Sequence, residues 1–226
     1  MSAEQLKQRD AMQRLTDFLN EVGMLRHTPR SGYKFLGSGQ ETVAEHSHRT
    51  AVIGYVLAKK TGADAARTVM LCLFHDLPEA RTGDFNYVNR LYDTSRERDA
   101  LEDAVEGTGL EEDIMSIWDE HACRTTPESL LAHDADQLDL ILNLKRESDL
   151  GNRYADKWLE SAVERLRTDI AKELAQTILK TDHTDWWYLG PDRNWWERKS
   201  CLLTAQSYRL KFLLHYIVKE LLYLHI

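Results

Sequence analysis

The sequence predicts an all-α protein, because apolar residues recur at helical spacing along nearly its whole length and no convincing alternating strand interrupts them. With 226 residues, the chain is long enough for one domain with a full hydrophobic core. Apolar residues make up 42% and charged residues 29%, with 11 Gly and 4 Pro, which is typical of an ordered protein. We therefore expect a globular helical bundle.

Loop-forming residues divide this pattern into separate helices. Residues 23–40 contain Pro29 and four glycines and should form an irregular loop. Pro78 should end a helix, because it lacks the amide hydrogen that continues the ladder and clashes with the preceding turn. The predicted helices cover residues 3–22, 42–60, 63–77, 95–106, 111–121, 127–149 and 153–180, with a polar loop over residues 84–94.

The C-terminal part has a different composition. It holds a tryptophan-rich turn followed by an amphipathic tail over residues 202–226. We expect one domain over residues 1–180 and an extension over residues 181–226, packed on that domain or at a subunit interface. Its apolar surface exceeds what a compact core of this size requires, which favours a homodimer. The tryptophans of the turn are Trp186, Trp187, Trp195 and Trp196.

Charge and cysteine usage narrow the class of protein. A net charge of −8 argues against binding a nucleic-acid polymer, because such proteins neutralise many phosphates with Lys and Arg. A single nucleotide remains compatible, since a metal and one or two arginines can hold one phosphate. The 3 cysteines show no CxxC spacing, and no segment resembles a signal peptide or a membrane span. We expect a cytoplasmic protein without membrane association.

Two histidines compete for a position inside the helix over residues 42–60. His46 shares a stripe with apolar residues at spacings of three and four, so it should face the core. His48 lies about 200° around the helix and should point outward. A single core-facing histidine is more often a hydrogen-bonded core residue than a metal ligand.

The pair His75-Asp76 is more informative, because it follows an apolar run. A charged Asp76 there would lose several kcal/mol of solvation free energy unless a cation or hydrogen bonds compensate. A capping role near Pro78 is the ordinary alternative. Further on, the helix over residues 127–149 is apolar on two faces and should be central. Asp134, Asp136 and Asp139 are all candidates there, and periodicity alone does not choose among them.

Three segments in order, ETVAEHSHR, LFHDLPEARTGD and HDADQLDL, resemble the HD-domain superfamily. The similar branch contains bacterial 5′-deoxynucleotidases of the YfbR type and the eukaryotic HD-domain-containing protein 2. The resemblance covers residues 19–150. It implies a helical domain that holds one divalent ion per chain, Mn²⁺, Co²⁺, Fe²⁺, Ni²⁺ or Mg²⁺. The ligands of the family's H…HD…D pattern would be His46, His75, Asp76 and Asp136.

The same resemblance implies further site residues. Glu79 and Asp84 match acidic residues of the family's active centre, and Arg30 matches an arginine that lies near the phosphate. The bacterial enzymes have a tryptophan beside that arginine, whereas this chain has Ser31-Gly32-Tyr33. The implied function is hydrolysis of the 5′-phosphate of small (deoxy)nucleoside monophosphates.

Chemistry supports this function and leaves alternatives open. A divalent ion polarises a phosphoryl group, and Glu79, one helical turn after His75, could orient water or exchange a proton with the leaving oxygen. A deoxynucleoside triphosphate triphosphohydrolase would use the same metal pattern, but no Lys/Arg cluster lies near the motifs. A di-iron oxygenase would need additional histidines, such as His48 or His133. An inactive regulatory or binding module is the third alternative.

Overall fold

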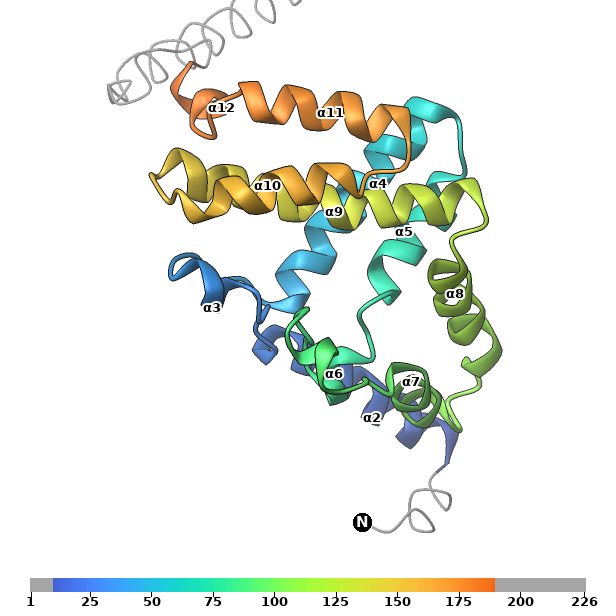
Figure 1. The fold of residues 1–226 in the computed structure, drawn as a ribbon. Helices are drawn as coiled ribbons and strands as arrows, with labels where there is room; N and C mark the ends of the chain where they lie inside the picture. Colours follow the sequence, from blue (N-terminus) through green and yellow to red (C-terminus); the bar gives the residue numbers. More distant parts are fainter. Residues whose placement is uncertain (1–9, 190–226) are drawn as a thin grey trace, which may run out of the picture. The chain divides into compact units, whose positions relative to one another are not determined.

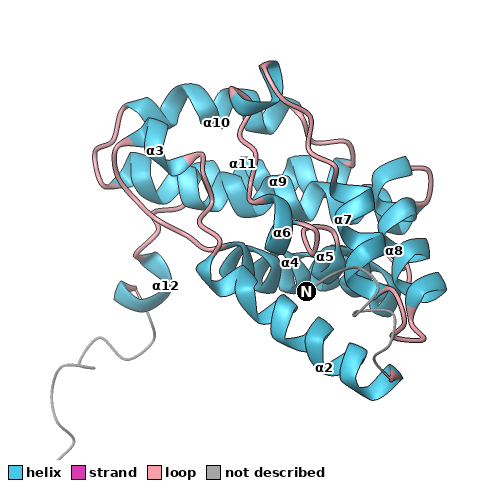
Figure 2. Cartoon of the chain, turned by 90° about the horizontal axis from the view of Figure 1, so that it is seen from below, coloured by secondary structure: helices cyan, strands magenta, loops and turns pink. Residues whose placement is uncertain are grey.

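The computed structural model describes residues 10–189, and this range contains only helices and loops (Figure 2). Within it, the β-type pairing is limited to one isolated bridge between Pro29 and Thr42. The predicted all-α fold is therefore confirmed. The chain forms two compact units, residues 1–183 and 184–226. The expected tail and the pair Trp195 and Trp196 lie outside the described residues.

The main core surrounds α9 (Pro127–Asp149), the longest of the described helices. It packs against α4 (Val43–Thr61) and α5 (Ala65–Phe74), while α10 (Tyr154–Glu164) runs beside it (Figure 1). Leu138 and Ile141 of α9 are fully buried. The prediction of a central helix, apolar on two faces, is thus confirmed.

A second, smaller core lies at the other end of this unit. Phe18 of α2 (Ala11–Val22) packs with Leu101 of α7 (Glu97–Val105) and Ile114 of α8 (Glu111–Cys123). Arg14 closes α7 by donating to the carbonyl oxygens of its last turn. Asp10 caps the N-terminus of α2, because its side chain accepts from the Gln13 amide.

Side-chain caps explain where the two site-bearing helices begin. The Thr42 hydroxyl accepts from the Glu45 amide, and the Glu45 carboxylate accepts from the Thr42 amide, which forms a capping box at α4. Thr126 and Ser129 form the same arrangement at α9. Each cap satisfies amides that have no partner inside the helix.

The expected single helix over residues 153–180 is wrong, because the chain forms α10 and then a separate α11 (Asp169–Lys180). The fully buried Asp134 carboxylate accepts from the amides of Arg167 and Thr168 at 2.9 and 2.7 Å. It also accepts from the Thr168 hydroxyl at 2.6 Å, and Thr168 caps α11. These tertiary hydrogen bonds stabilise the turn between α10 and α11, although the helical spacing of apolar residues continues through it.

Short elements connect the long helices. The segment over residues 23–40, expected to be an irregular loop, contains two of these short elements. Helix α5 ends at Phe74, before Pro78. None of the described helices is long and apolar enough to cross a bilayer. The short elements are η1 (Gly23–His27), α3 (Tyr33–Leu36), α6 (Glu79–Thr82), η2 (Asn89–Leu91) and α12 (Asp185–Tyr188), of which α12 belongs to the second unit.

Candidate metal centre and its pocket

Helices α4, α5 and α9 bring the candidate ligands together in the first unit. His46 on α4 is fully buried, whereas His48 is exposed, so the predicted helix phase is confirmed. His75 follows the last residue of α5 and is 8% exposed. The two imidazole rings lie 5.5 Å apart between centroids.

Both imidazoles use one ring nitrogen for a hydrogen bond inside the protein. Nδ1 of His46 lies 2.7 Å from Asp139 Oδ2, and Nδ1 of His75 lies 2.8 Å from the Cys72 carbonyl oxygen. Because a carbonyl oxygen can only accept, Nδ1 of His75 carries the proton. Nε2 of each ring is buried without a hydrogen-bond partner. Two nitrogens are therefore free to act as metal ligands.

Two carboxylates face these nitrogens. Asp136 Oδ1 lies 3.2 Å from His46 Nε2, and ligand atoms of His46, His75 and Asp136 all lie within 4.8 Å of one another. Asp76 Oδ2 lies 3.2 Å from His75 Nε2 and 3.6 Å from His46 Nε2. The four side chains that the family pattern indicates thus meet at one point.

The donor set at this point fits a divalent ion. Buried polar atoms without a partner are rare in proteins, and here two of them share one space with two carboxylates. Imidazole and carboxylate ligands suit a borderline or hard divalent metal. A Zn²⁺ ion of the structural type would be accompanied by cysteines, and the buried Cys72 bears no ligand role in this cluster.

The electrostatics of the site show how much negative charge it concentrates. Burial opposes protonation of His46, but the Asp136 and Asp139 side chains outweigh burial and raise the pKa of His46 to about 10. Burial also opposes ionisation of Asp136, yet His46, His75 and Arg30 hold its pKa well below the usual range. Without a metal, protons and Arg30 balance the charge that a cation would neutralise.

The structure separates the three aspartates that the sequence left open. Asp136 faces the histidine nitrogens, and Asp134 faces the opposite way, toward the turn before α11. Asp139 lies behind His46 and contacts the ring nitrogen that is turned away from the cluster. Asp139 is therefore placed to position His46 rather than to bind the ion.

A polar network fixes Asp139 in turn. Arg49, one turn after His46 on α4, donates through Nε to the Asp139 carboxylate and through Nη2 to its carbonyl oxygen at 3.2 Å. Arg49 also approaches Glu41 at 3.3 Å, and Asn143 donates to both Glu41 oxygens at 2.9 Å. No motif in the sequence marks this network, although Arg49 and Asp139 each lie three residues from a candidate ligand.

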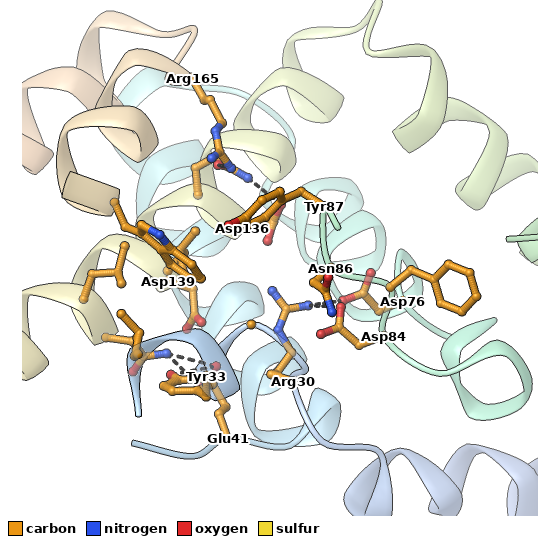
Figure 3. Close-up of a pocket in the computed structure, with 18 of the residues that line it drawn as sticks. Arg30, Tyr33, Glu41, Asp76, Asp84, Asn86, Tyr87, Asp136, Asp139 and Arg165 are labelled. Atoms are coloured by element: carbon orange, nitrogen blue, oxygen red, sulfur yellow. Dashed lines mark hydrogen bonds and ion pairs between the residues drawn. The ribbon is translucent and has the colours of Figure 1, made fainter. Parts of the chain in front are cut away.

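Arg30 extends from the segment after η1 into the same site (Figure 3). Its Nη1 lies 3.3 Å from Asp76 and 3.7 Å from Asp84. The Asp84 carboxylate also accepts a short hydrogen bond from the Ser31 amide, so it anchors the backbone next to Arg30. Gly83 ends α6 with φ 73°, a conformation that costs glycine little, and turns Asp84 toward Ser31.

Glu79, the first residue of α6, lines the same cavity. It is 4% exposed, and its Oε2 has no hydrogen-bond partner. Burial, followed by the charges of Asp76 and Asp84, raises the pKa of Glu79 to about 9. A buried carboxylate with an unused oxygen is suited to exchange protons with groups that enter the cavity.

A cavity of about 530 Å³ joins these residues. Sequence reasoning missed two of its cationic residues, because Arg90 lies in the predicted polar loop after the second motif and Arg165 lies far from all three motifs. Arg165 donates to Gln137 Oε1 at 3.4 Å, and Gln137 donates to Asp136 at 2.9 Å. The spacing of Trp158, Ser161 and Arg165 by three and four residues was the available signal, since it puts the first two on one face of α10 and Arg165, its C-cap, on the same side.

A helical domain with two histidines and two aspartates converging from three helices defines a class of metal-dependent proteins, and the family comparison agrees. The model of the HD domain matches residues 22–178, which is more than half of the chain. The chain belongs to the HD-domain family.

Individual relatives point to one branch of this family. The chain is 27% identical over 145 residues to 5′-deoxynucleotidase HDDC2 of Danio rerio, covering 62% of this chain and 72% of that protein. It is 29% identical over 145 residues to the Bos taurus protein of the same name, covering 62% and 70%. The similarity to the eukaryotic HD-domain-containing protein 2 is thus confirmed.

A solved structure shows the same fold. The conserved hypothetical protein from Pyrococcus furiosus superposes with a TM-score of 0.63 at 25% sequence identity. The match covers 74% of this chain and 99% of that protein. The additional length of the present chain therefore lies outside the common fold.

Proposed function

We propose that this protein is a divalent-metal-dependent phosphomonoesterase that hydrolyses the 5′-phosphate of (deoxy)nucleoside monophosphates. The observation that carries the proposal is the convergence of His46, His75 and Asp136, with Asp76 adjacent, on the cavity that Arg30 and Glu79 line. The names of the relatives support the same reaction.

Each residue has a distinct part in this reaction. The four side chains His46, His75, Asp76 and Asp136 would hold one divalent ion. When bound, such an ion supplies Lewis acidity that polarises the phosphoryl group and makes a water molecule more acidic. We assign Mn²⁺, Co²⁺, Fe²⁺, Ni²⁺ or Mg²⁺ to this position, because imidazole and carboxylate ligands together accept all of them.

Arg30 is placed to bind the phosphate, since its guanidinium always carries a charge and presents donors in a planar fork. Glu79 would orient the attacking water, pass its proton to O5′ of the ribose and take up the proton that the water releases. The bond between phosphorus and O5′ then breaks as the bond from phosphorus to the water oxygen forms. Asp84 would keep Arg30 in place through the Ser31 amide.

The charge of the cavity favours a monophosphate over a triphosphate. A triphosphate brings about four negative charges, and the lining offers few guanidinium groups to balance them. Because the lining nevertheless contains three arginines, a deoxynucleoside triphosphate triphosphohydrolase is the second candidate. The lining contains the six carboxylates Glu41, Asp76, Glu79, Asp84, Asp136 and Asp139 against the three guanidiniums of Arg30, Arg90 and Arg165.

A substrate screen tests the proposal. Protein purified without chelator is analysed for bound metal and incubated with 5′-ribo- and 5′-deoxyribonucleotides, 3′-monophosphates and deoxynucleoside triphosphates in each divalent metal. We expect phosphate release from deoxynucleoside 5′-monophosphates, slower release from ribonucleotides and little from 3′-monophosphates. Tripolyphosphate from triphosphates with inert monophosphates would favour the second candidate, and no turnover of any nucleotide would favour a regulatory module.

The charge of the chain and its C-terminal composition lead us to propose a cellular location and an assembly. We place the protein in the cytoplasm, with small nucleotides as partners and with neither nucleic-acid polymers nor membranes. We also propose a homodimer, with residues 181–226 packed on the catalytic domain of residues 1–180 or at the subunit interface. Light scattering at micromolar concentration should give twice the mass of one chain, and a monomer would contradict this assembly.

A further inference from the structure

The cavity extends well beyond the metal centre and ends in a region without a role in phosphate hydrolysis. Leu36, Leu140 and Leu144 line this region together with Tyr87 and Trp158. Leu36 and Leu144 are buried at 6% and 1% exposure. One end of the cavity is thus ionic and the other is apolar and aromatic.

Helix geometry gives the direction and length of the cavity. Asp136, Leu140 and Leu144 lie four residues apart on α9, so the lining extends about 12 Å from the metal centre along the helix axis. The neighbouring α10 runs antiparallel beside α9 (Figure 1). Arg165, which caps its C-terminus, donates to Gln137, so Trp158, seven residues earlier, lies farther along α9 in the direction of Leu144. This length is comparable to the reach of a nucleoside monophosphate from phosphorus to the base.

The aromatic rings at the far end form a supported wall. Tyr87 and Trp158 meet at 6.2 Å between ring centroids with planes inclined by 74°. Phe35, which does not line the cavity, contacts them at 5.7 and 6.4 Å. A β-carbon placed on Gly32 would lie 3.5 Å from the Trp158 ring, so the indole packs close to the backbone beside Arg30.

This wall remains accessible although its rings contact one another. Tyr87 is 60% exposed, and Trp158 is half-buried. Figure 3 draws Tyr87 among the residues that line the cavity. Large aromatic rings left open inside a cavity beside an ionic centre are typical of ligand contacts.

We propose that this aromatic end is a nucleobase subsite, in which the substrate base stacks on Trp158 and Tyr87 above Leu140 and Leu144. The proposal rests on the proposed function, because Arg30 and the metal centre would hold the phosphate at the opposite end. Stacking uses the π-face that all bases share, so this subsite selects nucleotides over base-free sugar phosphates.

The test compares two substrates on the full-length protein in the most activating metal. Deoxyguanosine 5′-monophosphate carries a base, and deoxyribose 5-phosphate does not. For Trp158→Ala, we expect the KM for the nucleotide to rise about 5- to 150-fold more than that for the sugar phosphate. Trp158→Phe should restore most of the difference, because it retains an aromatic face. Tyr154→Ala is the matched control, since Tyr154 is an exposed aromatic residue of α10 outside the cavity.

A second measurement does not depend on turnover. Calorimetry with the nucleoside deoxyguanosine, which has no phosphate, should show binding that Trp158→Ala loses and Tyr154→Ala retains. Binding of the nucleoside without hydrolysis of any nucleotide would refute the proposed function and leave the subsite standing. Hydrolysis with the same KM ratio in Trp158→Ala and in the parent would refute the subsite and leave the function standing. Equal loss on both substrates would also overturn it, because that result indicates a structural role.

Discussion

Replacing Asp139 by Asn tests how the metal centre is built, because this change keeps the volume of the side chain and removes its charge. Asp139 is fully buried and accepts from Nδ1 of His46 and from Arg49. Burial opposes its ionisation, yet the hydrogen bonds from His46 and Arg49 hold the pKa of Asp139 below its usual range. An asparagine has one oxygen and one NH₂ group for two donors, so it must leave one of them unmatched.

The hydrogen bonds of Asp139 set the expected losses of metal affinity and of stability. If the amide oxygen turns to Arg49, its NH₂ group faces His46 and favours the tautomer with the proton on Nε2, the atom needed for the metal. Such second partners of metal-bound histidines typically contribute about 10- to 100-fold in metal affinity. The lost charged hydrogen bond should lower the free energy of unfolding by about 1.5–3 kcal/mol. That corresponds to a fall of roughly 3–12 °C in Tm.

The assay combines metal titration by calorimetry with thermal unfolding in the absence of metal. Asp134→Asn is the matched control, because Asp134 lies on the same helix, is equally buried and accepts from Arg167 and Thr168. Asp134→Asn should reduce stability to a similar degree and leave metal affinity at the parent value. If Asp139→Asn binds metal as tightly as Asp134→Asn does, Asp139 does not position His46 and the reasoning is refuted.

Three further predictions concern the same centre. His46→Ala should abolish metal binding in elemental analysis and His48→Ala should retain it, and the reverse would contradict the assignment. Glu79→Gln should lose about 10²- to 10⁴-fold in turnover while it retains its metal and binds nucleotide like the parent; near-normal turnover would remove Glu79 from the mechanism, and loss of metal would make it a ligand. Because the metal-free protein holds a proton on His46 up to a pKa of about 10, the metal must displace it near pH 7. Apparent metal affinity from competition titrations should therefore rise between pH 6 and 9 by about tenfold per unit for each proton displaced, and a flat profile would contradict this.

Periodicity predicted the helices well wherever one face of a helix is buried along its full length. Residues 127–149 were predicted as a helix and form α9, because Thr126 caps it and its apolar faces pack on both sides. The choice of His46 over His48 followed from the same geometry, since residues two positions apart on a helix face different directions. These results depend on local spacing alone.

Periodicity failed where a distant side chain decides the local conformation. The amphipathic pattern continues through residues 153–180, yet the buried Asp134 carboxylate captures the amides of Arg167 and Thr168 and breaks the helix there. The partner that supplies this stabilisation lies 33 residues earlier in the chain. Helical spacing within the segment cannot reveal it, because the energy comes from a tertiary hydrogen bond.

Helical spacing predicted the all-α fold, and three ordered motifs indicated which side chains are candidates for a metal centre. The tertiary structure decided what each aspartate of HDADQLDL faces, because three carboxylates on one buried helix point to different neighbours. It also decided the character of the cavity, since Arg165, Trp158 and Tyr87 reach it from elements that no motif connects. Contacts between distant segments arise only when helices pack, so their chemistry becomes visible only in three dimensions.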